Sequence, residues 1–157
     1  MIAVNNTSCS WEALNTLQRA INNGGDKEEQ SVVEPSGNIT RGTAETVKTG
    51  NVSRTTMPGV AGNDNTGIHS HPLNSSITKD GLIASDSALR PGPDDPGTFT
   101  NYRTNIIVGR LGDQTGRIDA AGKITLDRNP PMGAAIYNRG GDFLLSITKS
   151  VIEKIIK

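Results

Sequence analysis

The sequence predicts a single α+β domain over residues 1–157, and three observations point to this fold class. A length of 157 residues fits one ordinary domain. Short apolar runs and period-two alternation, which are typical of strands, outnumber helical patterns, and the helical patterns lie near the two ends. The 18 glycines and 8 prolines indicate many turns. Because no repeat or linker divides the chain, we expect one strand-rich domain with helices at its ends.

The first helix is expected at residues 10–23. Ser10 would be its N-cap, and Gly24 and Gly25 would end it. A helix buries the residues that recur along one stripe of its surface. The stripe expected to face the core consists of Trp11, Leu14, Leu17 and Ile21.

Two strands follow, at residues 30–33 and 38–47, with a turn at residues 34–37 between them. Residues 48–65 are polar and carry glycine-rich and asparagine-rich turn signals, so they predict a loop.

A further short strand is expected at residues 66–71, ended by Pro72. Residues 73–104 show no clear period and predict loops and turns. Apolar runs then predict four strands, at residues 105–111, 123–126, 133–137 and 143–147. A short amphipathic helix is expected at residues 148–157.

Charge and composition argue against several function classes. Sixteen Lys and Arg balance sixteen Asp and Glu, so neither a nucleic acid nor a membrane surface is expected as a partner. No apolar run approaches the ~20 residues of a membrane span, and no signal peptide is recognised, so a soluble protein is expected. The single cysteine, Cys9, excludes a disulfide within the chain and a cysteine-based zinc site.

Both histidines lie in the segment Gly67-Ile68-His69-Ser70-His71-Pro72. Residues i and i+2 of a strand project from the same face, so His69 and His71 form a ready pair of metal ligands. The alternative is two exposed or hydrogen-bonded histidines near a loop. Acidic residues in the rigid segment 91–97 favour the metal, because two histidines, one carboxylate and an open water position are a common catalytic zinc set.

The segment His69-Ser70-His71-Pro72 resembles the HxHP signature of the JAB/MPN (JAMM) metalloproteases. The resemblance covers roughly residues 26–140 and is closest to JAB-like domains of bacterial polymorphic toxins and secreted effectors. It implies a curved mixed β-sheet flanked by helices, of the cytidine-deaminase-like kind, and one bound zinc ion.

In that family the third zinc ligand is the Asp of an S-x-x-D element. The best match here is Gly92-Pro93-Asp94-Asp95, so the resemblance implies Asp95 as the third ligand and Asp94 as the second choice. The spacing from His71 to Asp95 is about twice the usual one, as if a loop were inserted at residues 73–90. Asp80 and Asp86 in that loop are therefore rival ligands.

The family's element also contains a Ser, whose hydroxyl helps to polarise the scissile carbonyl. Gly92 occupies this position here. Either a nearby hydroxyl, that of Ser85 or Ser87, replaces it, or its contribution is missing.

The family's general acid/base is a Glu on an early strand, followed by a small residue and then an apolar pair. Glu28 fits this pattern with Ser31, Val32 and Val33, and is preferred over Glu29, which would put Val32 at the small position. The alternative for Glu28 is an ordinary exposed carboxylate in the charge cluster Lys27-Glu28-Glu29.

The resemblance implies a zinc-dependent peptidase or isopeptidase that hydrolyses an amide bond through a metal-activated water. Its context would be a bacterial toxin or effector domain, secreted as the C-terminal part of a larger protein. The expected partners are a protein or peptide substrate, such as a ubiquitin-like protein or a cell-wall peptide, and an immunity protein. Two alternatives stay open: a catalytically inactive JAB-fold binding module, and another metal-dependent hydrolase such as a nuclease or phosphodiesterase.

Overall fold

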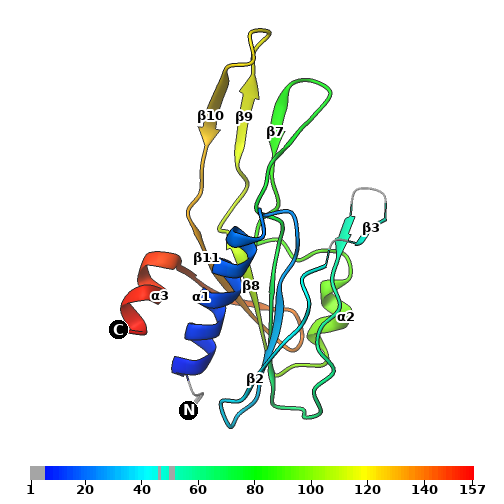
Figure 1. Ribbon diagram of the computed structural model, residues 1–157, viewed down its shortest axis with the longest axis vertical. Helices are drawn as coiled ribbons and strands as arrows, with labels where there is room; N and C mark the ends of the chain where they lie inside the picture. Colours follow the sequence, from blue (N-terminus) through cyan, green and yellow to red (C-terminus); the bar gives the residue numbers. More distant parts are fainter. Residues whose placement is uncertain (1–5, 46, 50–51) are drawn as a thin grey trace.

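The computed structural model describes residues 6–45, 47–49 and 52–157, and their fold is built around a six-stranded mixed sheet (Figure 1). Its strands are β1 (Gln30–Val33), β2 (Ile39–Arg41), β5 (Thr66–Ser70), β8 (Thr104–Arg110), β11 (Met132–Asn138) and β12 (Phe143–Thr148). They lie in the order β12-β11-β8-β5-β1-β2, with β5 and β8 parallel and the other neighbours antiparallel. The predicted α+β class is confirmed.

Helices cover the two faces of this sheet unequally. On one face α1 (Asn6–Asn22) and α3 (Lys149–Ile155) pack against each other and against the sheet. There Leu17 of α1 joins Ile106 and Val108 of β8 in the main core. On the opposite face Phe99 of the short helix α2 (Asp95–Phe99) packs with Ile107 of β8. No helix within the described residues combines the length and the apolar character needed to cross a lipid bilayer.

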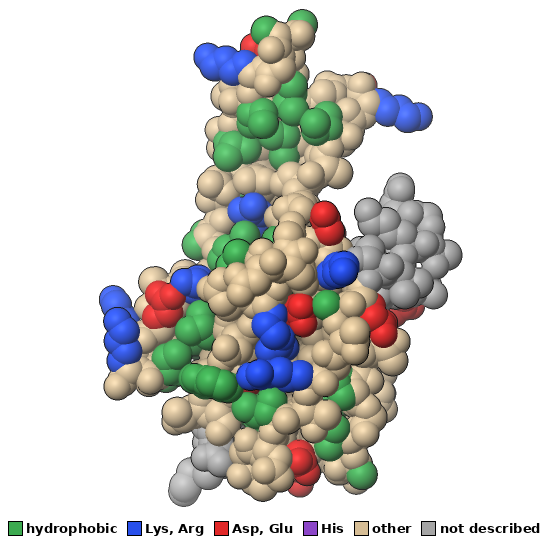
Figure 2. Space-filling view, viewed as in Figure 1, with side chains coloured by type: hydrophobic (Ala, Val, Ile, Leu, Met, Phe, Trp, Pro, Cys, Tyr) green, Lys and Arg blue, Asp and Glu red, His purple; other side chains and the backbone are tan. Residues whose placement is uncertain are grey.

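A second, four-stranded antiparallel sheet projects beyond the helices (Figure 1). Its order is β10-β9-β7-β6, from β6 (Ser76–Ile77), β7 (Leu82–Ala84), β9 (Thr115–Ile118) and β10 (Ile124–Arg128). The strand register places five apolar side chains on one of its faces: Ile77, Ile83, Ile118, Ile124 and Leu126. Figure 2 shows hydrophobic side chains gathered over this part of the molecule, and Ile77 is 62% exposed.

The first helix differs from its prediction at its start and in its buried face. It begins at Asn6, so Ser10 lies inside the helix and is not its N-cap. Trp11 and Ile21 of the expected stripe are exposed. Leu17 of that stripe is buried, and Leu14 is partly buried against the core. The other buried residues of the helix are Cys9, Glu12, Ala13, Thr16 and Ala20. The buried face includes Glu12 because hydrogen bonds from neighbouring elements satisfy its carboxylate.

Five main-sheet strands, together with β10 and α3, lie close to their predicted bounds. β1 has its predicted bounds, and β5, β8, β10, β11, β12 and α3 lie within two residues of theirs. The second strand is wrong in length, because β2 ends at Arg41. The expected loop at residues 48–65 contains most of a hairpin, β3 (Val47–Thr49) with β4 (Val52–Arg54). Residue 46 of the predicted strand 38–47 and residues 50–51 of the predicted loop lie outside the described residues.

The segment without a clear period, residues 73–104, was also wrongly predicted, since it contains β6, β7 and α2. β9 was missed as well. These elements are only two to five residues long, and a pattern of that length carries little periodic signal.

Candidate metal centre

Strand β5 places the two histidines on one side of the main sheet. Ile68 points into the core beneath α1, so by alternation His69 points to the opposite face, where α2 lies. His71 follows directly after β5 and stays aligned with the sheet, because its N–H donates to the carbonyl of Val108 at 3.0 Å. Both imidazoles are buried, and their ring centroids lie 5.4 Å apart.

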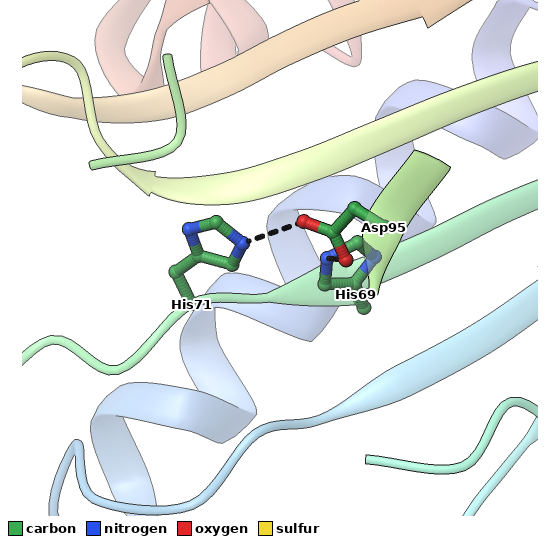
Figure 3. Close-up of side chains that lie close together, drawn as sticks. All are labelled: His69, His71 and Asp95. Atoms are coloured by element: carbon green, nitrogen blue, oxygen red, sulfur yellow. Dashed lines mark hydrogen bonds and ion pairs between the residues drawn. The ribbon is translucent and has the colours of Figure 1, made fainter. Parts of the chain in front are cut away.

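Asp95, the first residue of α2, completes a cluster with the two histidines (Figure 3). Its Oδ1 lies 3.2 Å from Nε2 of His69, and its Oδ2 lies 3.2 Å from Nε2 of His71. The Gly92 N–H donates to Oδ2 of Asp95 at 2.6 Å, which fixes the carboxylate. The three ligand atoms lie within 4.8 Å of one another, so the expected group of His69, His71 and Asp95 is present and is compatible with a metal ion.

The hydrogen bonds of the imidazoles fit this interpretation. Nδ1 of His71 lies 3.0 Å from the carbonyl of Ser87, so the carbonyl accepts the Nδ1 proton, and in the neutral imidazole Nε2 keeps a lone pair for a metal ion. Nε2 of His69 is buried and has no hydrogen bond of good geometry within the described residues, although Asp95 is near. A buried nitrogen without a hydrogen-bond partner is costly, and a metal ion would satisfy it.

The ionisable groups of the cluster change one another's pKa values. Burial alone would raise the pKa of Asp95, but the nearby imidazoles of His69 and His71 hold it well below its usual range. Burial likewise opposes the charged form of His71, but Asp95, Glu28 and the Ser87 carbonyl outweigh it and raise the pKa of His71. Asp95 is therefore ionised and able to act as a ligand.

A cavity of about 490 Å³ opens onto this cluster, and Glu28 lines it together with His69, His71 and Asp95. Glu28 lies just before β1 and is held there by a backbone pair with Glu45. Burial raises the pKa of the Glu28 carboxyl, against the opposing effect of the two histidines.

Glu29 lies on the other side of the sheet. Its carboxylate accepts hydrogen bonds from Nε of Arg19 at 3.2 Å and from Nδ2 of Asn23 at 2.9 Å, both at the end of α1. It does not line the cavity. Of the two neighbouring glutamates, the structure thus brings only Glu28 to the cluster.

The rival carboxylates are placed less well than Asp95. Asp86 and Asp94 line the same cavity, but both are exposed. Asp80 lies in the turn between β6 and β7 and does not line it. Among the described residues, the group within metal-ligand distance contains Asp95 and none of these three.

Neither expected substitute for the missing serine hydroxyl lines the cavity. Oγ of Ser85 accepts the N–H of Gln114, and Oγ of Ser87 accepts the N–H of Gly112. Both hydroxyls therefore bind the turn between β8 and β9. The threonines that line the cavity are Thr55, Thr56 and Thr98. No sequence pattern points to them, because they lie in segments without periodicity.

Ser70, which no sequence motif marks, connects two segments of the candidate centre. It is fully buried, and its Oγ accepts the N–H of Glu29 at 2.9 Å while its own N–H donates to the Glu29 carbonyl at 2.9 Å. This double contact joins the segment that carries Glu28 to the strand that carries the histidines. Period-two alternation places Ser70 on the face opposite the histidines, but it does not predict the contact with Glu29.

Comparisons with known proteins give no match for this chain, whether with protein-family models, with curated proteins or with solved structures.

Proposed function

We propose that this chain is a zinc-dependent amide hydrolase, a peptidase or isopeptidase of the JAB/MPN kind. The observation that carries the proposal is the convergence of His69, His71 and Asp95 with the buried carboxyl of Glu28 in one open cavity. These residues come from three separate segments, at the start of β1, the end of β5 and the start of α2. A cavity that gathers metal-ligand types and a carboxyl of raised pKa is a good candidate for an active site.

Zinc fits the donor set best, because two imidazoles and one carboxylate leave a fourth tetrahedral position open. His69, His71 and Asp95 would hold it. When bound, zinc would lower the pKa of a water ligand toward ~7 and polarise the carbonyl of the substrate.

Glu28 supplies the proton transfers. Its carboxyl lines the cavity, and its raised pKa brings it closer to the working pH of a general acid/base. In the proposed reaction Glu28 takes a proton from the attacking water and gives it to the leaving amine, so the peptide bond breaks with one water consumed. The resemblance to toxin and effector domains supports a protein or peptide as the substrate.

Elemental analysis of protein purified without added metal, combined with a cleavage panel, tests the proposal. We expect one zinc per chain, lost in His69→Ala and in His71→Ala, and cleavage of an amide among peptide, ubiquitin-linked and nucleic-acid substrates. Wild-type protein without zinc, or zinc retained after both histidines are replaced, would overturn it. Cleavage of only the nucleic acids would favour a nuclease.

Gly92 favours a second candidate, a metal-bearing binding module without catalytic activity. The family's hydroxyl is absent at this position, and neither Ser85 nor Ser87 lines the cavity in its place. Zinc bound at one per chain, without cleavage of any substrate in the panel, is the outcome that this second function predicts.

A further inference from the structure

A second cavity, of about 630 Å³, adjoins the one at the candidate metal centre. The two cavities share part of their walls, formed by Thr55, Thr56, Met57 and Thr98. Beyond this shared wall the second cavity is lined by the segment 58–63, by the chain after α2 and by Arg139, in the turn between β11 and β12. A ligand that occupies both cavities would therefore extend from the metal centre to Arg139.

The two cavities differ in charge. The first is lined by four carboxylates and by Arg90, whose guanidinium is already paired with Asp113 at 2.9 Å. The second is lined by Arg139 and by no acidic side chain. The second cavity therefore favours a negatively charged group of a ligand, and the first cavity does not.

Arg139 is exposed, and its hydrogen bonds go to neutral groups. Its Nε donates to the Tyr102 carbonyl at 3.3 Å, and its Nη2 donates to the Asn63 carbonyl. Both acceptors are neutral backbone groups, and the guanidinium forms no ion pair within the described residues. A guanidinium has five N–H donors, so an edge of the fork remains free while the two carbonyls fix its orientation.

We propose that the second cavity binds a carboxylate, which Arg139 holds through the free edge of its guanidinium. The planar fork matches a carboxylate bidentately, and prior fixation by two carbonyls lowers the entropy lost on binding. The inference deepens the proposed function and rests on it in one respect: the carboxylate would lie on the part of the substrate remote from the scissile amide.

The experiment is an NMR titration of the full chain with three probes. They are N-acetyl-tetraalanine, its C-terminal amide, and N-acetyl-Ala-Glu-Ala amide. We expect the first probe to bind about tenfold more tightly than the second, as for one charge-assisted hydrogen-bonded pair. Equal binding of the third probe would assign the site to side-chain carboxylates as well as to chain ends.

Arg139→Gln should abolish the preference for the carboxylate. Arg103→Gln is the matched control, because Arg103 is close in the fold but lines neither cavity. Since Arg139 also ties three loops together, a second pair of variants leaves its hydrogen bonds intact. A Cβ at Gly59 would meet no atom within 4 Å, so Gly59→Asp adds a competing carboxylate to the second cavity and Gly59→Asn is its neutral control.

His69→Ala separates this inference from the proposed function. His69 lines only the first cavity, so the variant should lose the metal and keep the carboxylate preference. The inference is overturned if wild-type protein binds carboxylate and amide probes equally, or if Arg139→Gln and Gly59→Asp both retain the preference. A wild-type protein that contains no metal but still prefers the carboxylate would contradict the proposed catalytic function and leave this inference standing.

Discussion

Glu28 and Glu29 are adjacent in the sequence but have different surroundings. Glu28 lines the cavity at the metal cluster, while Glu29 is hydrogen-bonded to Arg19 and Asn23 beneath the sheet. Replacing each glutamate by glutamine should therefore affect a different property of the protein.

Glu28→Gln should leave the zinc content unchanged and lower kcat/KM for amide cleavage by about 10²–10⁴-fold, because the amide cannot accept the proton of water. Glu29→Gln should leave cleavage nearly unchanged and lower the free energy of unfolding by about 1 kcal/mol, because a charge-assisted hydrogen bond is weakened. Metal analysis, kinetics and urea unfolding measure the three quantities. An inactive Glu29→Gln with an active Glu28→Gln would contradict the assignment.

Gly92 can be tested by restoring the side chain that the family resemblance implies. A Cβ there would lie 3.5 Å from Oδ2 of Asp95, an ordinary contact, and Gly92 has no positive φ. Gly92→Ser should therefore fold normally and raise kcat by about tenfold or more, since one well-placed donor to a developing oxyanion is worth at least that. Gly92→Ala, which fits but lacks a hydroxyl, is the control. A gain in both variants, or in neither, argues against a role for the hydroxyl.

Sequence patterns predicted the site residues to different degrees. Period two was sufficient to place His69 and His71 on one face, because the strand is regular. Asp95 required the motif resemblance, since nothing local shows that a residue 24 positions after His71 returns to it. No local pattern decides between Glu28 and Glu29, because no such pattern contains the contacts of Glu29 with Arg19 and Asn23.

At the scale of elements, an ion network joins α1 to β1 and β2. The Glu12 carboxylate, fully buried, lies 2.8 Å from Nη2 of Arg41 and 2.9 Å from Nη1 of Arg19, and accepts the Ser31 hydroxyl at 2.6 Å. Burial opposes ionisation, but the bonds from Arg41, Ser31 and Arg19 outweigh it and lower the pKa of Glu12. This network explains the error in the apolar stripe of α1: a helical face with Glu at its centre does not look buried.

The network makes stability depend on pH with a definite sign. Because the pKa of Glu12 is lower in the folded chain than its ordinary value of 4.5, the unfolded state binds protons more readily. The stabilisation is present above that pH and is lost as the pH falls below it. Glu12→Gln should lower the free energy of unfolding by about 1–3 kcal/mol at pH 7 and by less at pH 3. Urea unfolding at both pH values measures this, with Glu34→Gln as control; an equal loss at both would contradict the sign.

The main-sheet strands were predictable and those of the small sheet were less so, for a physical reason. β8 and β11 are buried and show clear apolar runs. β9 is short and contains Gly116 opposite Leu126, where a Cβ would come within 2.4 Å of the Thr125 carbonyl. The close approach of the two backbones requires a glycine at this position. In a sequence pattern, however, a glycine argues against a strand.

For the molecule as a whole, stability should be unequal between the two sheets. Every residue of β10 is exposed, and no helix of the described residues contacts the small sheet extensively. Backbone amides of β9 and β10 should therefore exchange with solvent at least about tenfold faster than those of β8 and β11, which lie between two helical layers. Hydrogen exchange followed by mass spectrometry measures this. Equal protection in the β9–β10 and β8–β11 pairs would show that the two sheets open as one unit.

The parallel pairing of β5 with β8 also determines when the candidate centre can form during folding. Parallel neighbours need a long crossover, and here residues 71–103 make it, with His71 at one end and Asp95 within it. The chain must first lose the entropy of closing this loop, and Glu28 comes from still another part of the sequence. The centre is therefore among the last parts to assemble. Refolding rates measured with zinc and with a chelator should coincide, and only the unfolding rate should become slower with zinc.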